Sequence, residues 1–179
     1  DYLNTYYDRT GSQILVVYGE KNVGKTTLLS AFSKDKPGIY LRARSASERE
    51  QRFLWNRELG SLCNDSYPSF TEIFQAVLPD EKGKKVIIID EFQHIIKNSD
   101  SFMKELVSFV HNQWNRQDVL VVLCSSSIGW IENSMVSKIG DAAYELSGLV
   151  KVKELGFEYL KEYFSNYSTT ECIEVYSVL

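Results

Sequence analysis

An apolar run that leads into a glycine-containing turn constrains the fold of this chain more than any other segment. Residues 14–18 are continuously apolar and end at Gly19, a pattern typical of a strand that is buried on both faces. Residues 25–32 are predicted as a helix that ends before Pro37. The chain is therefore predicted to contain a strand, a tight turn and a helix in direct succession.

The turn itself has the composition of a phosphate-binding loop. Gly19-Glu-Lys-Asn-Val-Gly-Lys-Thr26 matches the pattern G-x-x-x-x-G-K-[ST], in which glycines let backbone N–H groups curl round a phosphate. The positive N-terminal end of the following helix adds to this attraction. Lys25 is predicted to reach the β- and γ-phosphates of a nucleotide, and the Thr26 hydroxyl is predicted to bind Mg²⁺.

One continuous stretch is thus expected to hold the nucleotide. The alternative is a glycine-rich connection with a solvated lysine, which the strand before the motif and the helix after it disfavour. The expected nucleotide-binding residues of this stretch are Gly19, Glu20, Lys21, Asn22, Val23, Gly24, Lys25, Thr26 and Thr27.

A second apolar run ends in two adjacent carboxylates, Asp90 and Glu91, after Val-Ile-Ile-Ile at residues 86–89. Ligands of open α/β sheets bind at the carboxyl ends of the strands, so Asp90 is predicted to hold Mg²⁺, directly or through water. Glu91 is predicted to be the general base that accepts a proton from the attacking water. The alternative is a strand followed by a helix whose first turn favours acidic residues. The phosphate loop upstream favours the catalytic interpretation.

The residues around the acidic pair favour adenine over guanine. GTPases of the Ras type have D-x-x-G at this point, whereas this chain has Asp90-Glu-Phe-Gln93. Asn115-Arg-Gln-Asp118 is similar to the guanine-reading N-K-x-D, but it lacks the lysine and precedes a strand instead of following one. We therefore expect ATP with Mg²⁺. A small-molecule kinase is the remaining alternative, although such enzymes seldom carry adjacent Asp and Glu here.

A third apolar run, residues 119–124, ends in the turn Ser125-Ser126-Ser127. In ATPases that combine a phosphate loop with such an acidic pair, a strand of this kind lies between the phosphate-loop strand and the acidic strand. A polar residue at the end of that strand can contact the γ-phosphate or the attacking water. We expect Ser126 to act in catalysis in this way and Ser125 to contact the nucleotide. The alternative is that a serine caps a helix over residues 128–136, and the two interpretations can hold for different serines.

Apolar strands alternate with helices along almost the whole chain, and this alternation predicts the fold class. Capping boxes, in which a serine is followed three residues later by Glu, begin helices at Ser47, Ser69 and Ser168. The fold is predicted to be α/β, a three-layer sandwich with a mostly parallel sheet. The other predicted elements are strands at 39–41 and within 144–155, the latter broken by Gly148, and helices at 47–60, 69–79, 98–114 and 156–164.

Composition excludes several classes of function. The 20 Lys and Arg against 24 Asp and Glu give a net charge of −4, whereas domains that grip nucleic acid carry a basic excess. The cysteines Cys63, Cys124 and Cys172 have neither zinc-ligand nor disulfide-framework spacing, which indicates a reducing, cytoplasmic compartment. No apolar run approaches the about 20 residues that a membrane span needs, so no membrane partner is expected.

Taken together, these motifs resemble one family. Residues 19–27, Ile89-Asp-Glu-Phe-Gln93 and the serine turn are similar to the archaeal-type ATPase domain, also found in bacteria, within the AAA+/STAND group of P-loop ATPases. The similarity extends to residues 150–155 and 157–164. It implies a sheet in the order 5-1-4-3-2, ATP with Mg²⁺, and slow, regulated hydrolysis that switches an attached effector.

The resemblance also implies a longer protein, with a winged-helix segment and sometimes a nuclease-like domain after the part shown. DNA contact is expected only through such domains. The chain lacks a starting Met and stops at Leu179 inside a predicted helix, which indicates a fragment. We expect residues 1–165 to form the ATPase core and residues 166–179 to begin a following helical segment.

The chain departs from this family in ways that bear on turnover. Relatives often carry an arginine after the serine turn, but residues 137–143 have none, and Lys138 is a candidate substitute. An arginine finger contributes about 10³–10⁵ in rate, so fast autonomous turnover is not expected. The N-terminal segment that would help to cover adenine starts only at Asp1. Two functions stay open: ATP hydrolysis, and a nucleotide-binding switch with little turnover that controls an attached domain.

Three further basic residues are interpreted as structural. His94, four residues after Asp90, is expected to make an ordinary hydrogen bond on a helix. Arg42 and Arg44 follow the second strand and are interpreted as a solvated surface pair. A contact between these arginines and a phosphate or a partner is the alternative.

Overall fold

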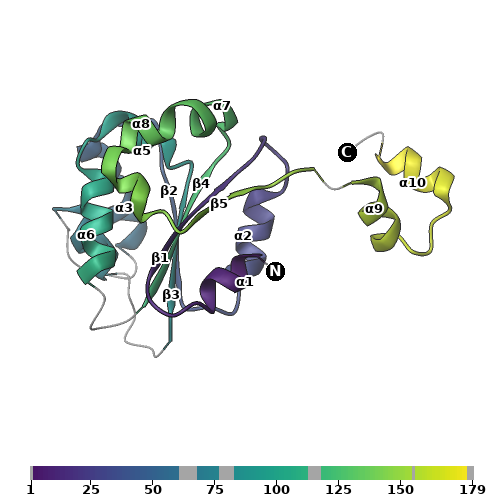
Figure 1. The fold of residues 1–179 in the computed structure, drawn as a ribbon, viewed down its shortest axis with the longest axis horizontal. Helices are drawn as coiled ribbons and strands as arrows, with labels where there is room; N and C mark the ends of the chain where they lie inside the picture. The colour runs from purple at the N-terminus through teal and green to yellow at the C-terminus, as the bar shows by residue number, and fades with distance from the viewer. Residues whose placement is uncertain (1, 61–67, 77–82, 113–117, 155, 177–179) are drawn as a thin grey trace.

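The computed structural model describes residues 2–60, 68–76, 83–112, 118–154 and 156–176, and a five-stranded sheet lies at its centre. All neighbouring strands run parallel. They lie in the order β2-β3-β4-β1-β5 (Figure 1), so the predicted order 5-1-4-3-2 and the predicted fold class are confirmed. The strands are β1 (Gln13–Tyr18), β2 (Gly38–Arg42), β3 (Lys85–Asp90), β4 (Val119–Ser125) and β5 (Gly148–Lys151).

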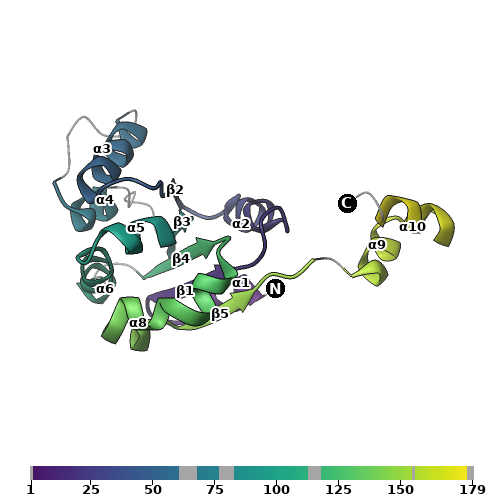
Figure 2. The same ribbon diagram turned by 90° about the horizontal axis from the view of Figure 1, so that it is seen from above.

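Helices cover both faces of this sheet and complete three layers (Figure 2). On one face, Leu29 and Phe32 pack with the strand residues Leu15 and Val17. This face is covered by α1 (Tyr2–Tyr7) and α2 (Lys25–Ser33). The other face is covered by α3 (Glu48–Leu59), α4 (Phe70–Ala76), α5 (Gln93–Asn98) and α6 (Phe102–Asn112), and by the segment of α7 (Ile128–Trp130), the π-helix η1 (Ile131–Met135), α8 (Val136–Ile139) and the 3₁₀ helix η2 (Gly140–Glu145).

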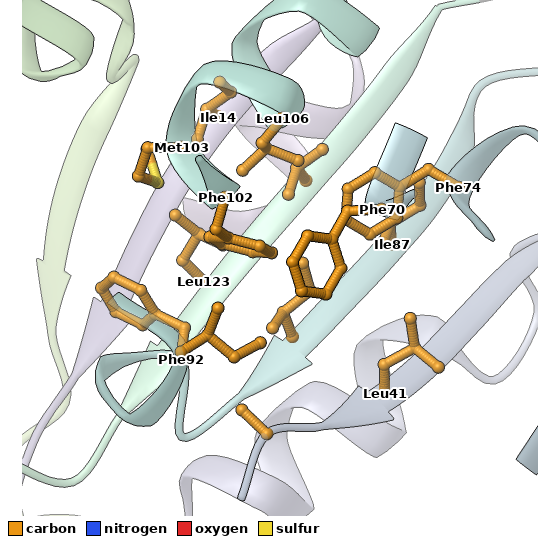
Figure 3. Packing of buried hydrophobic residues seen from close by; sticks show 14 of the residues in the cluster. Ile14, Leu41, Phe70, Phe74, Ile87, Phe92, Phe102, Met103, Leu106 and Leu123 are labelled. Atoms are coloured by element: carbon orange, nitrogen blue, oxygen red, sulfur yellow. The ribbon is translucent and has the colours of Figure 1, made fainter. Parts of the chain in front are cut away.

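An aromatic cluster fills the space between the sheet and helices α3 to α6 (Figure 3). The rings of Phe70 and Phe102 meet edge to face with centroids 5.1 Å apart, and Trp55 lies 5.5 Å from Phe70. All three residues are fully buried and belong to the same cluster as Ile87 and Leu123 of the central strands. Such ring pairs add about 0.5–1.5 kcal/mol beyond area burial, so the cluster fixes these helices on the strands.

Capping boxes begin the helices where the sequence predicted them. The Ser47 hydroxyl accepts a hydrogen bond from Glu50 N, and the Glu50 carboxylate accepts one from Ser47 N at 2.9 Å. Ser168 makes the same arrangement at the start of α10 (Thr169–Tyr176). At α4, the Ser69 hydroxyl accepts from a first-turn N–H. These local signals are reliable because both partners lie within one helical turn.

The helix predicted over residues 98–114 begins later in the structure, where α6 spans Phe102–Asn112. Asn98 ends α5, and Ser99 adopts an extended conformation with φ −141° and ψ 123°. The Ser99 hydroxyl then accepts a hydrogen bond from Phe102 N at 3.1 Å. This side-chain hydrogen bond sets the start of α6, and the apolar positions from Met103 to Val110 that indicated the helix lie within it. Trp114 and the predicted helix end near Pro79 lie outside the described residues.

Four other differences concern the first and last thirds of the chain. Gly148 begins β5, which pairs with β1, instead of breaking a strand. A Cβ at this position would overlap the Tyr6 hydroxyl, which explains the glycine. Tyr144 belongs to η2, so the strand predicted within residues 144–155 is shorter than expected. The helix predicted over 128–136 continues to Ile139 through a π-helical turn. Helix α1 was not predicted at all.

The last two described helices lie apart from the sheet. α9 (Phe157–Tyr163) and α10 pack on each other, and both views show them beyond the extended segment that follows β5 (Figures 1 and 2). The expected boundary at residue 165 falls in the turn between them. Among the described helices, none combines the length and the apolar character needed to cross a bilayer.

Candidate functional site

The residues predicted for the site come together where β1, β3 and β4 end. Gly19 follows β1, Asp90 ends β3 and Ser125 ends β4. Backbone hydrogen bonds join these ends: Gly19 N donates to Ser125 O at 3.3 Å, and Phe92 N donates to Cys124 O at 3.1 Å. One edge of the sheet therefore carries the phosphate loop, the acidic pair and the serine turn, as a parallel sheet of this order requires.

Positive backbone angles shape the phosphate loop. Asn22 has φ 68° and Gly24 has φ 90°, in the left-handed region that Asn and Gly tolerate best. A Cβ at Gly19 would lie 2.3 Å from Val152 O, so only glycine fits against the segment after β5. Among the described residues, no side chain caps the N-terminus of α2, which leaves its first N–H groups directed at the loop where an anion can bind.

Lys25 is buried, and its ammonium group turns into the loop. Nζ donates to Gly19 O at 2.9 Å and to Glu20 O, and only 6% of the residue is exposed. The two carbonyls keep the Lys25 ammonium group inside the loop, where the phosphates of a nucleotide would compete with them for its hydrogen bonds. Thr26 follows in the first turn of α2, next to the same loop.

A cavity of about 430 Å³ opens over the loop, within the range of ligand pockets. Glu20 and Val23, both predicted to bind nucleotide, line a different cavity of about 420 Å³ beside Val152, which shares no described lining residue with the first. Ser125 is fully buried, and its hydroxyl accepts a hydrogen bond from Ser127 N at 3.1 Å. The residues that line the 430 Å³ cavity are Lys21, Asn22, Gly24, Lys25, Thr26, Thr27, Tyr40, Arg42, Asp90, Glu91 and Ser126.

Tyr40 lies between the two residues predicted to bind Mg²⁺, and no motif had singled it out. Its hydroxyl donates to Asp90 Oδ2 at 2.7 Å and also interacts with the Thr26 side chain. Burial, together with the hydrogen bond to Asp90 and the charge of that residue, raises the pKa of Tyr40 well above its usual value. Tyr40 is therefore a neutral hydrogen-bond donor. A tyrosine near the carboxyl end of a mostly apolar strand is the sequence signal that could have found it.

The serine turn holds Glu91 in place. The Glu91 carboxylate accepts hydrogen bonds from the Ser126 hydroxyl at 2.8 Å, from Ser126 N at 3.3 Å and from Gln93 Nε2 at 2.6 Å. Glu91 has φ 54°, which costs a non-glycine residue about 1 kcal/mol and is typical of functional sites. Burial acts to raise the pKa of Glu91, but the hydrogen bonds from Gln93 and Ser126 outweigh it and lower the pKa. Glu91 is therefore ionised at neutral pH.

A second cavity, of about 720 Å³, adjoins the first and shares Glu91 and Ser126 with it. Five of its described lining residues are basic and one, Glu91, is acidic. The two arginines and the histidine that the sequence analysis interpreted as structural therefore lie near Glu91. Lys138 is not among them, because its Nζ lies 3.2 Å from Asp100 Oδ1 beside a separate groove of α6 and α8. The basic residues of the 720 Å³ cavity are Lys21, Arg42, Arg44, His94 and Lys97.

The donor atoms at the smaller cavity fit Mg²⁺. Thr26 offers a hydroxyl oxygen and Asp90 a carboxylate oxygen, and both line the same cavity. Mg²⁺ prefers such hard oxygen ligands and usually keeps several waters, together with substrate phosphates, in its coordination shell. The residues present therefore suit a metal ion that is shared with a bound nucleotide.

A parallel sheet in this order, with a phosphate loop after β1 and an Asp-Glu pair at the end of β3, defines the class of P-loop ATPase domains. The family model of an ATPase domain that occurs predominantly in Archaea matches residues 1–179. The chain belongs to this family, and the resemblance drawn from its motifs is confirmed.

Known proteins are similar to the chain in sequence or in fold. An uncharacterised protein of Methanocaldococcus jannaschii is 25% identical over 174 residues, which are 97% of this chain and 38% of that protein. The Walker-type ATPase of Pyrococcus abyssi has a TM-score of 0.67 at 19% identity, covering 99% of this chain and 61% of its own. The ORC2 protein of Aeropyrum pernix, in ADPNP–ADP complexes, has a TM-score of 0.58 at 17% identity, covering 96% and 49%. The chain thus spans less than two thirds of each of these proteins.

Proposed function

We propose that this domain binds ATP and hydrolyses it in a reaction that depends on Mg²⁺. The observation that carries the proposal is that Lys25, Thr26, Asp90 and Glu91 line one cavity at the edge of the sheet, although two distant segments supply them. Membership of an archaeal ATPase family supports the proposal, as does a fold similar to that of a Walker-type ATPase.

The role of each residue follows from its chemistry. The loop N–H groups bind the phosphate chain, and Lys25 exchanges its carbonyl partners for β- and γ-phosphate oxygens. Thr26 and Asp90 hold Mg²⁺, which neutralises phosphate charge when bound. The Glu91 carboxylate accepts the proton of the water that adds to the γ-phosphorus. The bond from that phosphorus to the bridging oxygen breaks, and ADP and phosphate leave.

The serines complete this assignment. Ser126 positions the Glu91 carboxylate through the hydrogen bonds described above, in addition to the contact with the attacking water that its place at the strand end predicts. The predicted contact between Ser125 and the nucleotide stays a prediction, because the Ser125 hydroxyl is engaged with Ser127 N.

Phosphate release by the full-length protein tests the proposal, with Glu91→Gln as the decisive variant. We expect this variant to release phosphate about 10²–10⁴ times more slowly than the wild type. It should still bind ATP·Mg²⁺, which adds about 2.7 kcal/mol of stability at 100 times Kd. Equally slow release by both proteins would contradict hydrolysis, and greater stabilisation by GTP than by ATP would contradict the choice of adenine.

A nucleotide-binding switch with little turnover is the second candidate function. It is favoured by the absence of an arginine from residues 137–143 and by the engagement of Lys25 with loop carbonyls, which must be exchanged for phosphate oxygens before turnover. In this case the bound ATP or ADP sets the state of an attached DNA-binding or nuclease-like domain. Phosphate release then stays slow even in the full-length wild type.

We further propose that the domain works as part of a longer protein, since it spans 38% of its relative from Methanocaldococcus jannaschii. Residues 1–165 would form the ATPase core, and residues 166–179 would begin the next helical segment. Contact with DNA would occur only through further domains; the ORC1 protein of Aeropyrum pernix, with a TM-score of 0.52, was solved in complex with DNA.

The buried free thiols of Cys124 and Cys172 are those expected in the cytoplasm.

A further inference from the structure

Arg42 is placed at the nucleotide site by the alternation of residues along β2. Successive strand residues point to opposite faces of a sheet, and Leu41 lies in the aromatic-rich core on the α3 side (Figure 3). Tyr40 faces the other way, where its hydroxyl reaches Asp90. Arg42 shares the face of Tyr40, lies in register with Asp90 at the carboxyl end of β2, and lines both the 430 Å³ and the 720 Å³ cavity.

Buried polar side chains fix the backbone of Arg42. Its carbonyl accepts hydrogen bonds from Trp55 Nε1 at 2.9 Å and from Gln51 Nε2 at 3.4 Å, and both donor residues are almost fully buried. The next residue, Ala43, donates its N–H to Asp90 O at 2.8 Å. The Cα of Arg42 is thereby held relative to the acidic pair, which is the support that a functional side chain needs.

The guanidinium group of Arg42 is available for a ligand. Within the part of the chain that the structure describes, no ion pair engages it. Arg44 differs, because its guanidinium lies 3.9 Å from the Glu58 carboxylate and it lines only the larger of the two cavities. The two arginines that look alike in the sequence are therefore distinct in their surroundings.

The charge of the larger cavity argues against a second chain as the source of an arginine here. Lys21, Arg44 and Lys97 line this cavity together with Arg42, and Glu91 is the one carboxylate residue in the described lining. A further cation from a partner would meet like charges, which repel. Arg42 is already in place beside these cations, and no second chain has to bind to bring it there.

We propose that Arg42 contacts the γ-phosphate of ATP bound to the same chain and stabilises the charge that develops on it during hydrolysis. This inference rests on the proposed function. Arg42 is exposed, as the sequence interpretation expected, and the inference takes up the alternative of a contact with a phosphate. The forked guanidinium can bind two phosphate oxygens while water adds to the γ-phosphorus, the bond to the bridging oxygen breaks and the proton passes to Glu91. ADP lacks the group that Arg42 binds.

Nucleotide affinities of the full-length protein test this contact without relying on turnover. We expect Arg42→Ala to weaken ATP·Mg²⁺ binding about tenfold and to change ADP binding less than about twofold. Arg44→Ala is the matched control, and it should change neither affinity. An equal loss for ATP and ADP, no loss at all, or the same loss in Arg44→Ala would overturn the inference.

Single-turnover phosphate release tests the catalytic part. We expect Arg42→Ala to be about 100-fold slower than the wild type, below the range of a fully enclosed arginine finger, and Arg42→Lys to be intermediate because lysine keeps the charge without the fork. A mixture of Arg42→Ala with Lys25→Ala should release phosphate no faster than Arg42→Ala alone, and recovery toward the wild-type rate in that mixture would overturn the same-chain contact. A wild type that binds no ATP rejects the proposed function itself, whereas a wild type that binds ATP beside an unaffected Arg42→Ala rejects this inference alone.

Discussion

At each of the two edges of the sheet, a lysine ammonium group donates hydrogen bonds to backbone carbonyls, but these contacts serve different purposes. At the carboxyl edge, Lys25 donates to two carbonyls of the phosphate loop and also lines an open cavity. At the opposite edge, Lys84 donates to the carbonyls of Tyr6, Arg9 and Gly11 at distances between 2.8 and 3.3 Å. One lysine has partners that a ligand can replace, and the other joins the N-terminal segment to β3.

The surroundings of the two lysines explain the difference. Around Lys84 the neighbouring groups bind one another: the Tyr7 hydroxyl donates to Lys84 O at 2.9 Å, and Gly11 N donates to the Asp118 carboxylate at 2.9 Å. Around Lys25 the backbone is held at positive φ, and the neighbouring charges face a cavity. Contacts of the first kind stabilise the fold, whereas contacts of the second kind preserve charged groups for a substrate.

Removing Lys25, the lysine of the carboxyl edge, should have the largest effect of the changes considered, and the affected quantity should be the affinity for ATP·Mg²⁺. We expect Lys25→Ala to weaken ATP·Mg²⁺ binding at least about 100-fold, since a charge-assisted contact with two phosphates is lost. The free energy of unfolding should change by less than about 1 kcal/mol. Calorimetric titration and urea denaturation measure the two quantities, with exposed Lys34→Ala as the control. A large loss of stability in Lys25→Ala would contradict the distinction between a lysine that serves ligand binding and a lysine that stabilises the fold.

Removing the lysine of the opposite edge should show the reverse pattern. We expect Lys84→Met to lower the free energy of unfolding by about 2 kcal/mol, because three carbonyls lose a charged donor at a partly exposed site. The affinity for ATP·Mg²⁺ should be unchanged. Urea denaturation of this variant beside Lys34→Met checks the first statement, and nucleotide titration checks the second. A tenfold loss of ATP affinity in Lys84→Met would show that the edges are coupled.

Tyr40→Phe sharpens the comparison within the carboxyl edge, because it removes one hydroxyl that contacts Asp90. We expect the Mg²⁺ concentration needed for half-maximal ATP binding to rise about tenfold, the lower end of what loss of a partner of a metal ligand costs. Binding of ADP without Mg²⁺ should not change. Titration of Mg²⁺ at fixed ATP gives the answer, and an unchanged Mg²⁺ dependence would show that Tyr40 does not hold the carboxylate for the metal.

Ser126→Ala should have the smallest effect, and that effect should depend on pH. Hydrogen bonds lower the pKa of Glu91 in the folded protein, so they contribute stability above the usual glutamate pKa and lose it as the pH falls through the folded value. We expect the variant to lose about 1 kcal/mol at pH 7, a small value because the carboxylate is partly exposed. The difference should shrink below about pH 4.5. Urea denaturation at pH 7 and pH 4 measures it, and an equal loss at both would exclude a role for the Glu91 charge.

The parts of the fold that the sequence predicted are those encoded by neighbouring residues. The apolar runs before Gly19 and Asp90 located two strands, and the serine at position 47 located a helix start to the residue. The predicted helix start at Asn98 was wrong, because Asn98 ends α5 and the Ser99 hydroxyl accepts a hydrogen bond from Phe102 N at the start of α6. A pattern of apolar residues cannot show which of two competing local hydrogen bonds forms.

The residues of the candidate site also fall into those that the sequence predicted and those that it did not. The sequence by itself determined which residue types follow each strand, and hence Lys25, Thr26 and the Asp-Glu pair, because each lies within a few residues of the strand or helix that positions it. Only the tertiary structure decided that Tyr40 and Arg42 face these residues and that Lys138 does not. Pairing of β2 with β3 brings together segments about 50 residues apart, and contacts at such separations arise from packing of the whole domain rather than from local pattern.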